Sequence, residues 1–225
     1  MPASTEKLVV DGVGGGIELA LDWPAAAPLG IVYIGHPHPL YGGTFDNKVV
    51  ATIARTFAGL GWVAVRPNFR GVGASAGEHD EGEGETEDFL RLINSLPTLP
   101  AVRSRLPDEL PIALAGFSFG SFVAAKAAQT LAASNRPPAY VILVGAAAGK
   151  WPMPNVTRDA LVIHGELDET IPLADVLDWA RPQDLPIVVI PGADHFFHRR
   201  LALLKRLISA HILGLPAIDA APQTD

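Results

Sequence analysis

The sequence contains no cysteine and no long apolar run, and it has fewer basic than acidic residues. The absence of cysteine excludes disulfides, thiolate metal sites and a cysteine nucleophile. No apolar run reaches the ~18 residues of a membrane span, and the segment from Met1 to Asp11 lacks the apolar stretch of a secretory signal. We therefore expect a cytoplasmic protein that does not bind membranes.

Acidic residues outnumber basic ones by 24 to 17, so the formal net charge is −7, which argues against nucleic acid as a partner. The excess is local, because seven acids lie between Glu78 and Asp88 and the rest of the chain is balanced. This segment is typical of a solvated loop that leads into a helix, whose first turn favours acids. The ligand spacing of an EF-hand calcium loop is absent.

The length of 225 residues and the hydrophobic fraction of 48% indicate one globular domain. We expect a single domain over residues 1–215 and a frayed tail over residues 216–225, which are rich in proline, alanine and polar residues.

Short apolar segments alternate with helical patterns along the chain. A hairpin of Leu8–Val10 and Ile17–Trp23 precedes six β-branched runs that are typical of strands buried on both faces. This alternation predicts an eight-stranded, mostly parallel α/β sheet flanked by helices. The six runs are Ile31–Ile34, Val63–Val65, Ile112–Ala115, Tyr140–Val144, Leu161–Ile163 and Ile187–Ile190, and the predicted helices are Asn47–Ala58, Glu85–Leu96, Phe119–Ala133, Leu173–Ala180 and Phe196–Leu213.

One proline-containing segment argues against a lid domain, and one glycine-rich segment does not fit a nucleotide-binding loop. The connection Gly145–Asp159 contains Trp151-Pro-Met-Pro154, which leaves no room for a lid domain. The triplet Gly14-Gly15-Gly16 is not followed by a helix, so it does not indicate a nucleotide-binding loop.

A G-x-S-x-G motif, Gly116 to Gly120, connects a predicted strand to a predicted helix. This arrangement is typical of a nucleophilic serine, here Ser118, on a strained turn whose following helix directs its amide dipoles at the site. The serine needs a base and an orienting acid. Asp168 and His195 follow two later strands, and the carboxyl ends of parallel strands share one sheet edge. We therefore predict a Ser118–His195–Asp168 triad.

Other interpretations of these positions stay open. Ser118 is also suited to cap the following helix, and the acid to cap a later one. Glu166 or Glu169 is the alternative acid, and His198 the alternative base. His164 lies at the end of its strand, where we expect a packed and hydrogen-bonded side chain.

Two backbone N–H groups are needed to stabilise the oxyanion of an acyl-transfer reaction. The residue after the nucleophile, Phe119, supplies one. The loop Gly35–Gly43 is expected to supply the other, and because its two prolines have no N–H, His38 is the predicted donor, with Leu40 next. His36 is expected to brace this loop, and no third ligand accompanies the two histidines, so we expect no metal.

From Ile17 to Leu213 the chain resembles the α/β-hydrolase superfamily, which has the same order of nucleophile, acid and histidine. The stretch His-Gly-x-x-Asp that ends at Asp168 and the segment Asn68–Ser75 are similar to superfamily motifs. The stretches His36–Lys48 and Gly82–Glu85 resemble a group of small bacterial serine hydrolases without a cap, related to the dienelactone hydrolases.

This resemblance implies an α/β-hydrolase fold without a lid, carboxylesterase-type activity and no cofactor. The chain departs from the dienelactone hydrolases in having Ser118 rather than cysteine, and from the commoner loop in having Pro37 after His36. Their lactone substrate is therefore not carried over.

We predict that the protein hydrolyses short-acyl carboxylic esters through an acyl-enzyme. Its expected partner is therefore a small-molecule ester. The same triad also serves thioesterases and peptidases, and a non-catalytic binding protein on this fold is the alternative of another class. The sequence carries no signature of an oligomeric state. Candidate walls of the open cleft are Tyr41, Phe117, Trp151 and Met153.

Two arginine-containing features have structural interpretations. Arg70 is expected to bind a carboxylate within the fold, with a clamp on a substrate carboxylate as the alternative. The last predicted helix is interpreted as having a solvated basic face, with an anionic membrane as the alternative ligand. Its basic residues are Arg199, Arg200, Lys205 and Arg206.

Overall fold

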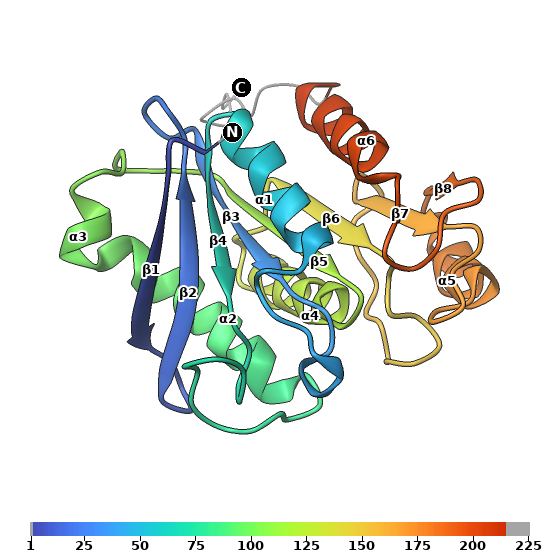
Figure 1. Cartoon of the computed structure of the whole chain (residues 1–225), viewed down its shortest axis with the longest axis horizontal. Helices are drawn as coiled ribbons and strands as arrows, with labels where there is room; N and C mark the ends of the chain where they lie inside the picture. The colour runs from blue at the N-terminus through green and yellow to red at the C-terminus, as the bar shows by residue number, and fades with distance from the viewer. Residues whose placement is uncertain (1, 215–225) are drawn as a thin grey trace.

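The computed structural model describes residues 2–214, in which eight strands alternate with helices (Figure 1). The predicted tail over residues 216–225 lies outside the described residues. The strands are β1 (Ser4–Asp11), β2 (Gly16–Trp23), β3 (Gly30–Gly35), β4 (Trp62–Pro67), β5 (Ile112–Phe117), β6 (Tyr140–Val144), β7 (Leu161–Gly165) and β8 (Ile187–Ile190). The helices are α1 (Lys48–Gly59), α2 (Glu83–Ser95), α3 (Pro100–Arg103), α4 (Phe119–Ala133), α5 (Leu173–Ala180) and α6 (Leu201–Gly214), with 3₁₀ turns η1 (Pro39–Tyr41), η2 (Leu96–Thr98) and η3 (Arg181–Gln183).

The strands form one sheet in the order β1-β2-β4-β3-β5-β6-β7-β8. β2 is antiparallel to β1 and β4, and all the other neighbours are parallel. This confirms the predicted eight-stranded, mostly parallel sheet that begins with a hairpin. The carboxyl ends of β5, β7 and β8 therefore lie at the same edge.

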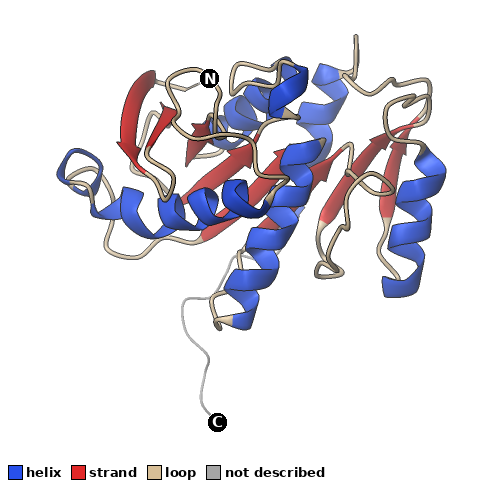
Figure 2. Cartoon of the chain, turned by 90° about the horizontal axis from the view of Figure 1, so that it is seen from below, coloured by secondary structure: helices blue, strands red, loops and turns tan. Residues whose placement is uncertain are grey.

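Helices cover both faces of the sheet (Figure 2). Successive side chains of β3 alternate between two cores: Ile31 and Tyr33 pack with the cluster of α2, α4 and α5, while Val32 and Ile34 pack with that of α1 and α6. Because both faces are covered, the central strands are apolar throughout, as the sequence indicates. None of the described helices has the length and apolar character that a membrane crossing requires.

The helix predictions hold at α4 and α5, whose bounds are the predicted ones. The predicted start of the last helix is wrong, because α6 begins at Leu201 rather than at Phe196. Phe197 and Arg199 have positive φ angles of 54° and 59°, which interrupt the helical path. Residues 145–159 contain neither helix nor strand, so the connection carries no lid.

Candidate active site

Ser118 occupies the turn between β5 and α4 with φ 55° and ψ −124°, a strained conformation for a residue other than glycine. The two glycines of the motif are required by close backbone approach. A Cβ at Gly116 would overlap the carbonyl of Gly120, and a Cβ at Gly120 would overlap the carbonyl of Gly35. The turn is therefore pressed against the end of β3, where the loop that carries His38 begins.

The structure brings the three predicted triad residues together. The Ser118 hydroxyl lies 3.1 Å from Nε2 of His195, and Nδ1 of His195 lies 2.7 Å from Oδ2 of Asp168. A carboxylate accepts, so the Nδ1–H of His195 donates to Asp168, and Nε2 is free to accept the serine proton. All three residues are buried, which strengthens the electrostatic interactions among them.

Asp168 both orients His195 and caps the turn that follows it. Its Oδ1 accepts the N–H groups of Thr170 and Ile171 at 2.9 and 2.8 Å. Burial raises the pKa of Asp168, but the hydrogen bonds from His195 and Ile171 outweigh burial and lower it, so the group is a carboxylate at neutral pH. Asp168 therefore has both predicted roles: its Oδ1 caps the turn, and its Oδ2 holds His195.

The alternative acids and base have other neighbours. Glu166 accepts the N–H of Gly192 at 2.8 Å, and Glu169 is exposed. His198 is exposed and its Nδ1 lies 2.6 Å from Asp194 Oδ2, a contact that lowers the pKa of Asp194. None of these side chains takes a place in the hydrogen-bonded chain from Ser118.

His164 is fully buried, as expected, and its Nε2–H donates to the Ile171 carbonyl at 2.9 Å. Burial lowers the pKa of His164, so it is neutral beside Asp168, whose Oδ2 is 3.4 Å away. A neutral His164 supports the acid turn without competing with His195 for the charge of Asp168.

The loop after β3 contains His38, whose backbone N–H is the predicted second donor to the oxyanion. His38, Ser118 and Phe119 line the same pocket of about 70 Å³. Within residues 2–214, the N–H groups of His38 and Phe119 donate to no protein acceptor, whereas Leu40 N–H donates to His38 Nδ1 at 3.2 Å. The Leu40 amide is therefore engaged, and the His38 amide remains available for substrate.

His36 braces this loop, as the sequence suggests. Its Nδ1–H donates to the Pro37 carbonyl at 2.6 Å, and its Nε2 accepts the N–H of Phe69 at 2.9 Å. Burial lowers the pKa of His36 to about 4, despite the hydrogen bond to Pro37. Among the described residues, no three His, Cys, Asp or Glu side chains are grouped so as to hold a metal ion.

Two of the four predicted wall residues, Tyr41 and Trp151, line the pocket beside Ser118. Phe117 is not a wall, because it is fully buried and packs beneath His195, with ring centroids 4.9 Å apart. Met153 is half-buried, packs against the core and is not part of this pocket lining.

Sequence reasoning missed two residues near the site. Ser121 donates its hydroxyl hydrogen to the Ser118 carbonyl at 2.6 Å and accepts the Ala147 N–H at 3.0 Å, so it ties the nucleophile turn to the loop after β6. His79 packs against His38, with ring centroids 4.6 Å apart and the ring planes tilted by 48°, and its Nδ1 lies 2.8 Å from Glu85 Oε1. Each role also depends on a contact distant in sequence, Ser121 with Ala147 and His79 with His38, for which the sequence carries no spacing signal.

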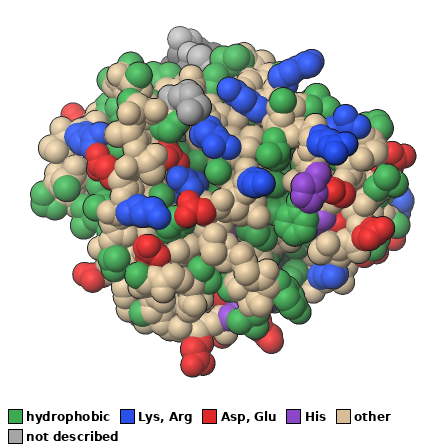
Figure 3. Space-filling view, in the orientation of Figure 1, with side chains coloured by type: hydrophobic (Ala, Val, Ile, Leu, Met, Phe, Trp, Pro, Cys, Tyr) green, Lys and Arg blue, Asp and Glu red, His purple; other side chains and the backbone are tan. Residues whose placement is uncertain are grey.

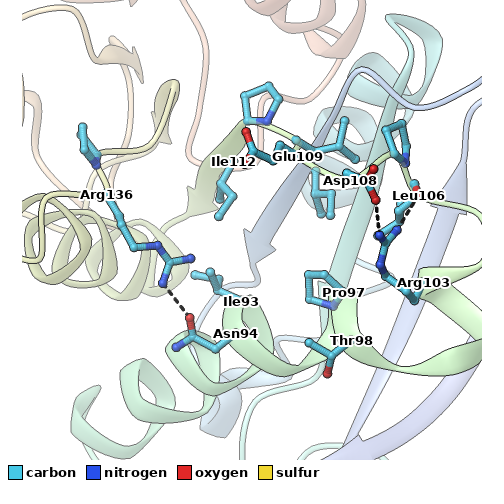
Figure 4. A pocket seen from close by; sticks show the side chains of 15 residues that line it. Ile93, Asn94, Pro97, Thr98, Arg103, Leu106, Asp108, Glu109, Ile112 and Arg136 are labelled. Atoms are coloured by element: carbon cyan, nitrogen blue, oxygen red, sulfur yellow. Dashed lines mark hydrogen bonds and ion pairs between the residues drawn. The ribbon is translucent and has the colours of Figure 1, made fainter. Parts of the chain in front are cut away.

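Arg70 lies away from the pocket and binds a carboxylate within the fold, as expected. Its Nε–H donates to Asp88 at 2.6 Å, and this bond raises the pKa of Arg70. A second cavity, of about 770 Å³, lies at the amino ends of β3 and β5 and contains none of the triad residues. Figure 4 shows Arg136 there, hydrogen-bonded to Asn94 at 2.9 Å.

No family model matches the chain, but solved structures do. An α/β serine hydrolase without lid from Xanthomonas campestris is 35% identical, with 99% of each chain covered and a TM-score of 0.82. An α/β serine hydrolase homologue from Coxiella burnetii is 34% identical over 94% of this chain and 98% of that chain, with a TM-score of 0.76. An uncharacterized protein of Rickettsia prowazekii is 28% identical in an alignment of 201 residues, which covers 84% of this chain and 80% of the relative.

The first two similarities extend over nearly the whole length of both partners and agree with the strand order and the absence of a lid segment. The chain therefore belongs to the α/β serine hydrolases, and its fold is the lidless form of that fold.

Proposed function

We propose that this hydrolase cleaves carboxylic esters through an acyl-enzyme formed on Ser118. One observation carries the proposal: an unbroken hydrogen-bonded chain from the Ser118 hydroxyl through His195 to Asp168, with lengths of 3.1 and 2.7 Å. Such a chain is what an otherwise weak hydroxyl nucleophile needs for activation.

In the first half of the reaction, His195 Nε2 takes the proton as Ser118 Oγ attacks the ester carbonyl. The N–H groups of Phe119 and His38 stabilise the oxyanion. His195 then gives its proton to the leaving alcohol, and the acyl group stays on the serine. In the second half, His195 activates a water that hydrolyses the acyl-enzyme, and Asp168 stabilises the imidazolium in both halves.

The pocket beside Ser118 favours short acyl groups. Its volume is about 70 Å³, well below the roughly 300–1,000 Å³ of common small-molecule sites, so it suits a small acyl group. Trp151 and Phe119 lie 4.9 Å apart by ring centroid and form an apolar wall for such a group. We therefore propose acetyl-type esters as the best substrates.

The test is covalent labelling with a fluorophosphonate followed by peptide mass spectrometry. We expect one adduct on Ser118, loss of labelling in His195→Ala, and a fall in kcat of about 10⁴- to 10⁶-fold for ester hydrolysis in Ser118→Ala. Ser134→Ala, an exposed serine at the end of α4, is the matched control and should label like the parent chain. Undiminished ester turnover in Ser118→Ala would refute the mechanism.

A panel of acyl-matched esters, thioesters and peptides then tests the substrate class. Faster turnover of the thioester or the peptide would replace the ester proposal with one of those activities. A folded chain that neither labels nor turns over any of them would favour the non-catalytic binding protein.

We place the chain among small serine hydrolases related to the dienelactone hydrolases, on the strength of the His36–Lys48 stretch, and expect a cytoplasmic enzyme whose partner is a small-molecule ester and which needs no cofactor.

A further inference from the structure

A groove of about 600 Å³ opens beside the proposed catalytic histidine. Its walls are residues 42–49, which end the loop after β3 and begin α1, and residues 196–201, which follow His195. Phe196 forms the boundary between groove and triad, since its ring lies 5.1 Å from that of His195 by centroid and its side chain is 47% exposed. Neither Ser118 nor His195 is in the groove lining, so Phe196 is the residue that connects the groove to the triad.

The proposed chemistry assigns this groove to the alcohol portion of the substrate. The leaving oxygen must come within hydrogen-bond reach of His195 Nε2, which protonates it. The small pocket lies on the side of Phe119 and His38, where the oxyanion forms, and the groove lies on the side of the loop that carries His195. Acyl and alcohol portions therefore point in different directions from Ser118.

Two cations line the groove. Neither Lys48 nor Arg199 has a carboxylate within 4.0 Å among residues 2–214. The acid in the lining, Asp46, lies 3.8 Å from Lys7 and 3.6 Å from Arg66, so its charge is already balanced. The Lys48 and Arg199 charges are therefore available to a ligand.

Other charged side chains around the groove add to the positive potential of Lys48 and Arg199. Figure 3 shows Lys and Arg side chains gathered on the face formed by α1 and α6, although the whole chain carries a net charge of −7. A second hollow, which contains His195 itself and shares Phe196 with the groove, is lined by the acids Glu169 and Asp194. An anionic group on the alcohol would be repelled there and attracted into the groove.

The backbone also holds Arg199 at the groove. Arg199 has a φ of 59° and Phe197 one of 54°, conformations that residues other than glycine rarely adopt. Because of this turn, Arg199 lies ahead of α6 rather than on its solvated surface, where the sequence pattern places it.

We propose that this groove binds an anionic group on the alcohol portion of the substrate. The preferred substrate is then a short-acyl ester of an alcohol or phenol that carries a carboxylate or a phosphate. This inference rests on the proposed esterase function, and it adds the direction and the charge of the leaving group.

The test compares three acetyl esters with the same aromatic ring: those of 4-hydroxybenzoate, of 4-hydroxyphenyl phosphate and of neutral methyl 4-hydroxybenzoate. The measured quantity is the ratio of kcat/KM for each anionic ester to that for the neutral one, determined in each variant. Comparing ratios between variants cancels the intrinsic reactivity of the leaving groups.

Lys48→Gln and Arg199→Gln should each lower the ratio by about fivefold, the upper end for an exposed ion pair. Arg55→Gln, an exposed cation on α1 outside the groove lining, is the matched control and should leave the ratio unchanged. Added salt should reduce the preference in the parent chain and have less effect in the variants.

The outcomes separate this inference from the proposed function. If Ser118 is labelled and the neutral ester is hydrolysed, but the ratio is the same in all variants, the groove does not bind the anion and the esterase proposal stands. If only the phosphate ester responds, the ligand is a phosphate. If no ester is hydrolysed and Ser118 is not labelled, the proposed function fails and this inference fails with it.

Discussion

Protonation of His36 should make the protein lose stability in mildly acidic solution. In the folded chain, Nδ1–H donates to the Pro37 carbonyl and Nε2 accepts the Phe69 N–H. A proton on Nε2 would place two donors face to face, and its charge would be buried. Burial accordingly lowers the pKa of His36 from 6.5 to about 4.

The unfolding free energy falls as the pH falls because the folded and unfolded chains bind different numbers of protons. Between pH 6.5 and 4 the unfolded chain binds a proton at His36 that the folded chain does not, so this contribution is complete above pH 6.5 and is lost as the pH falls. Each pH unit costs up to about 1.4 kcal/mol of unfolding free energy, and we expect a loss of roughly 2.5 kcal/mol by pH 4.5.

Urea unfolding followed by tryptophan fluorescence at several pH values between 4.5 and 7.5 measures this loss. His36→Gln should be less stable at pH 7.5 by about 1–3 kcal/mol, because a buried hydrogen bond is lost, but should depend less on pH. His164, whose pKa burial also lowers, is present in both chains and cancels in the difference. A stability difference that is the same at pH 4.5 and pH 7.5 would refute the reasoning.

Two substitutions test the packing that positions the site. Gly120→Ala places a methyl group on the carbonyl of Gly35, so we expect a loss of about 3 kcal/mol in urea unfolding together with slower fluorophosphonate labelling, and a chain of unchanged stability would contradict the close approach. Asp22→Asn removes the buried carboxylate that pairs with Arg66 at 2.8 Å and leaves only the exposed Asp46 at 3.6 Å, so it should cost about 3 kcal/mol in the same assay. A loss below about 1 kcal/mol would show that water reaches Arg66.

The sheet and the proposed triad could be predicted because both depend on local patterns that the topology then brings together. Each central strand is a short apolar run, and Asp168 and His195 both follow such runs. Once the strands are parallel, their carboxyl ends share an edge, so the 77-residue separation of Ser118 and His195 has no bearing on their distance.

The wall residues could not be predicted in the same way. Phe117 and Phe119 flank Ser118, and the sequence treats them alike. Because Phe117 is still part of β5, its side chain points to the core beneath His195, whereas Phe119 begins α4 and reaches the pocket. The face that each aromatic side chain occupies is set by where the strand ends, to within one residue, and sequence patterns do not define strand ends so closely.

The acidic segment shows why a charge count is a poor guide to burial. The helix predicted to begin at Glu85 begins at Glu83, and Glu85 is fully buried rather than solvated. The side-chain oxygens of Glu85 accept the N–H groups of Asp80 and Gly82 at 3.0 and 2.8 Å and contact His79, so this buried polar side chain has hydrogen-bond partners at the start of α2. His79 in turn packs on His38, whose ring lines the pocket beside Ser118. A segment that composition assigns to solvent therefore supports the loop that presents the proposed oxyanion donor.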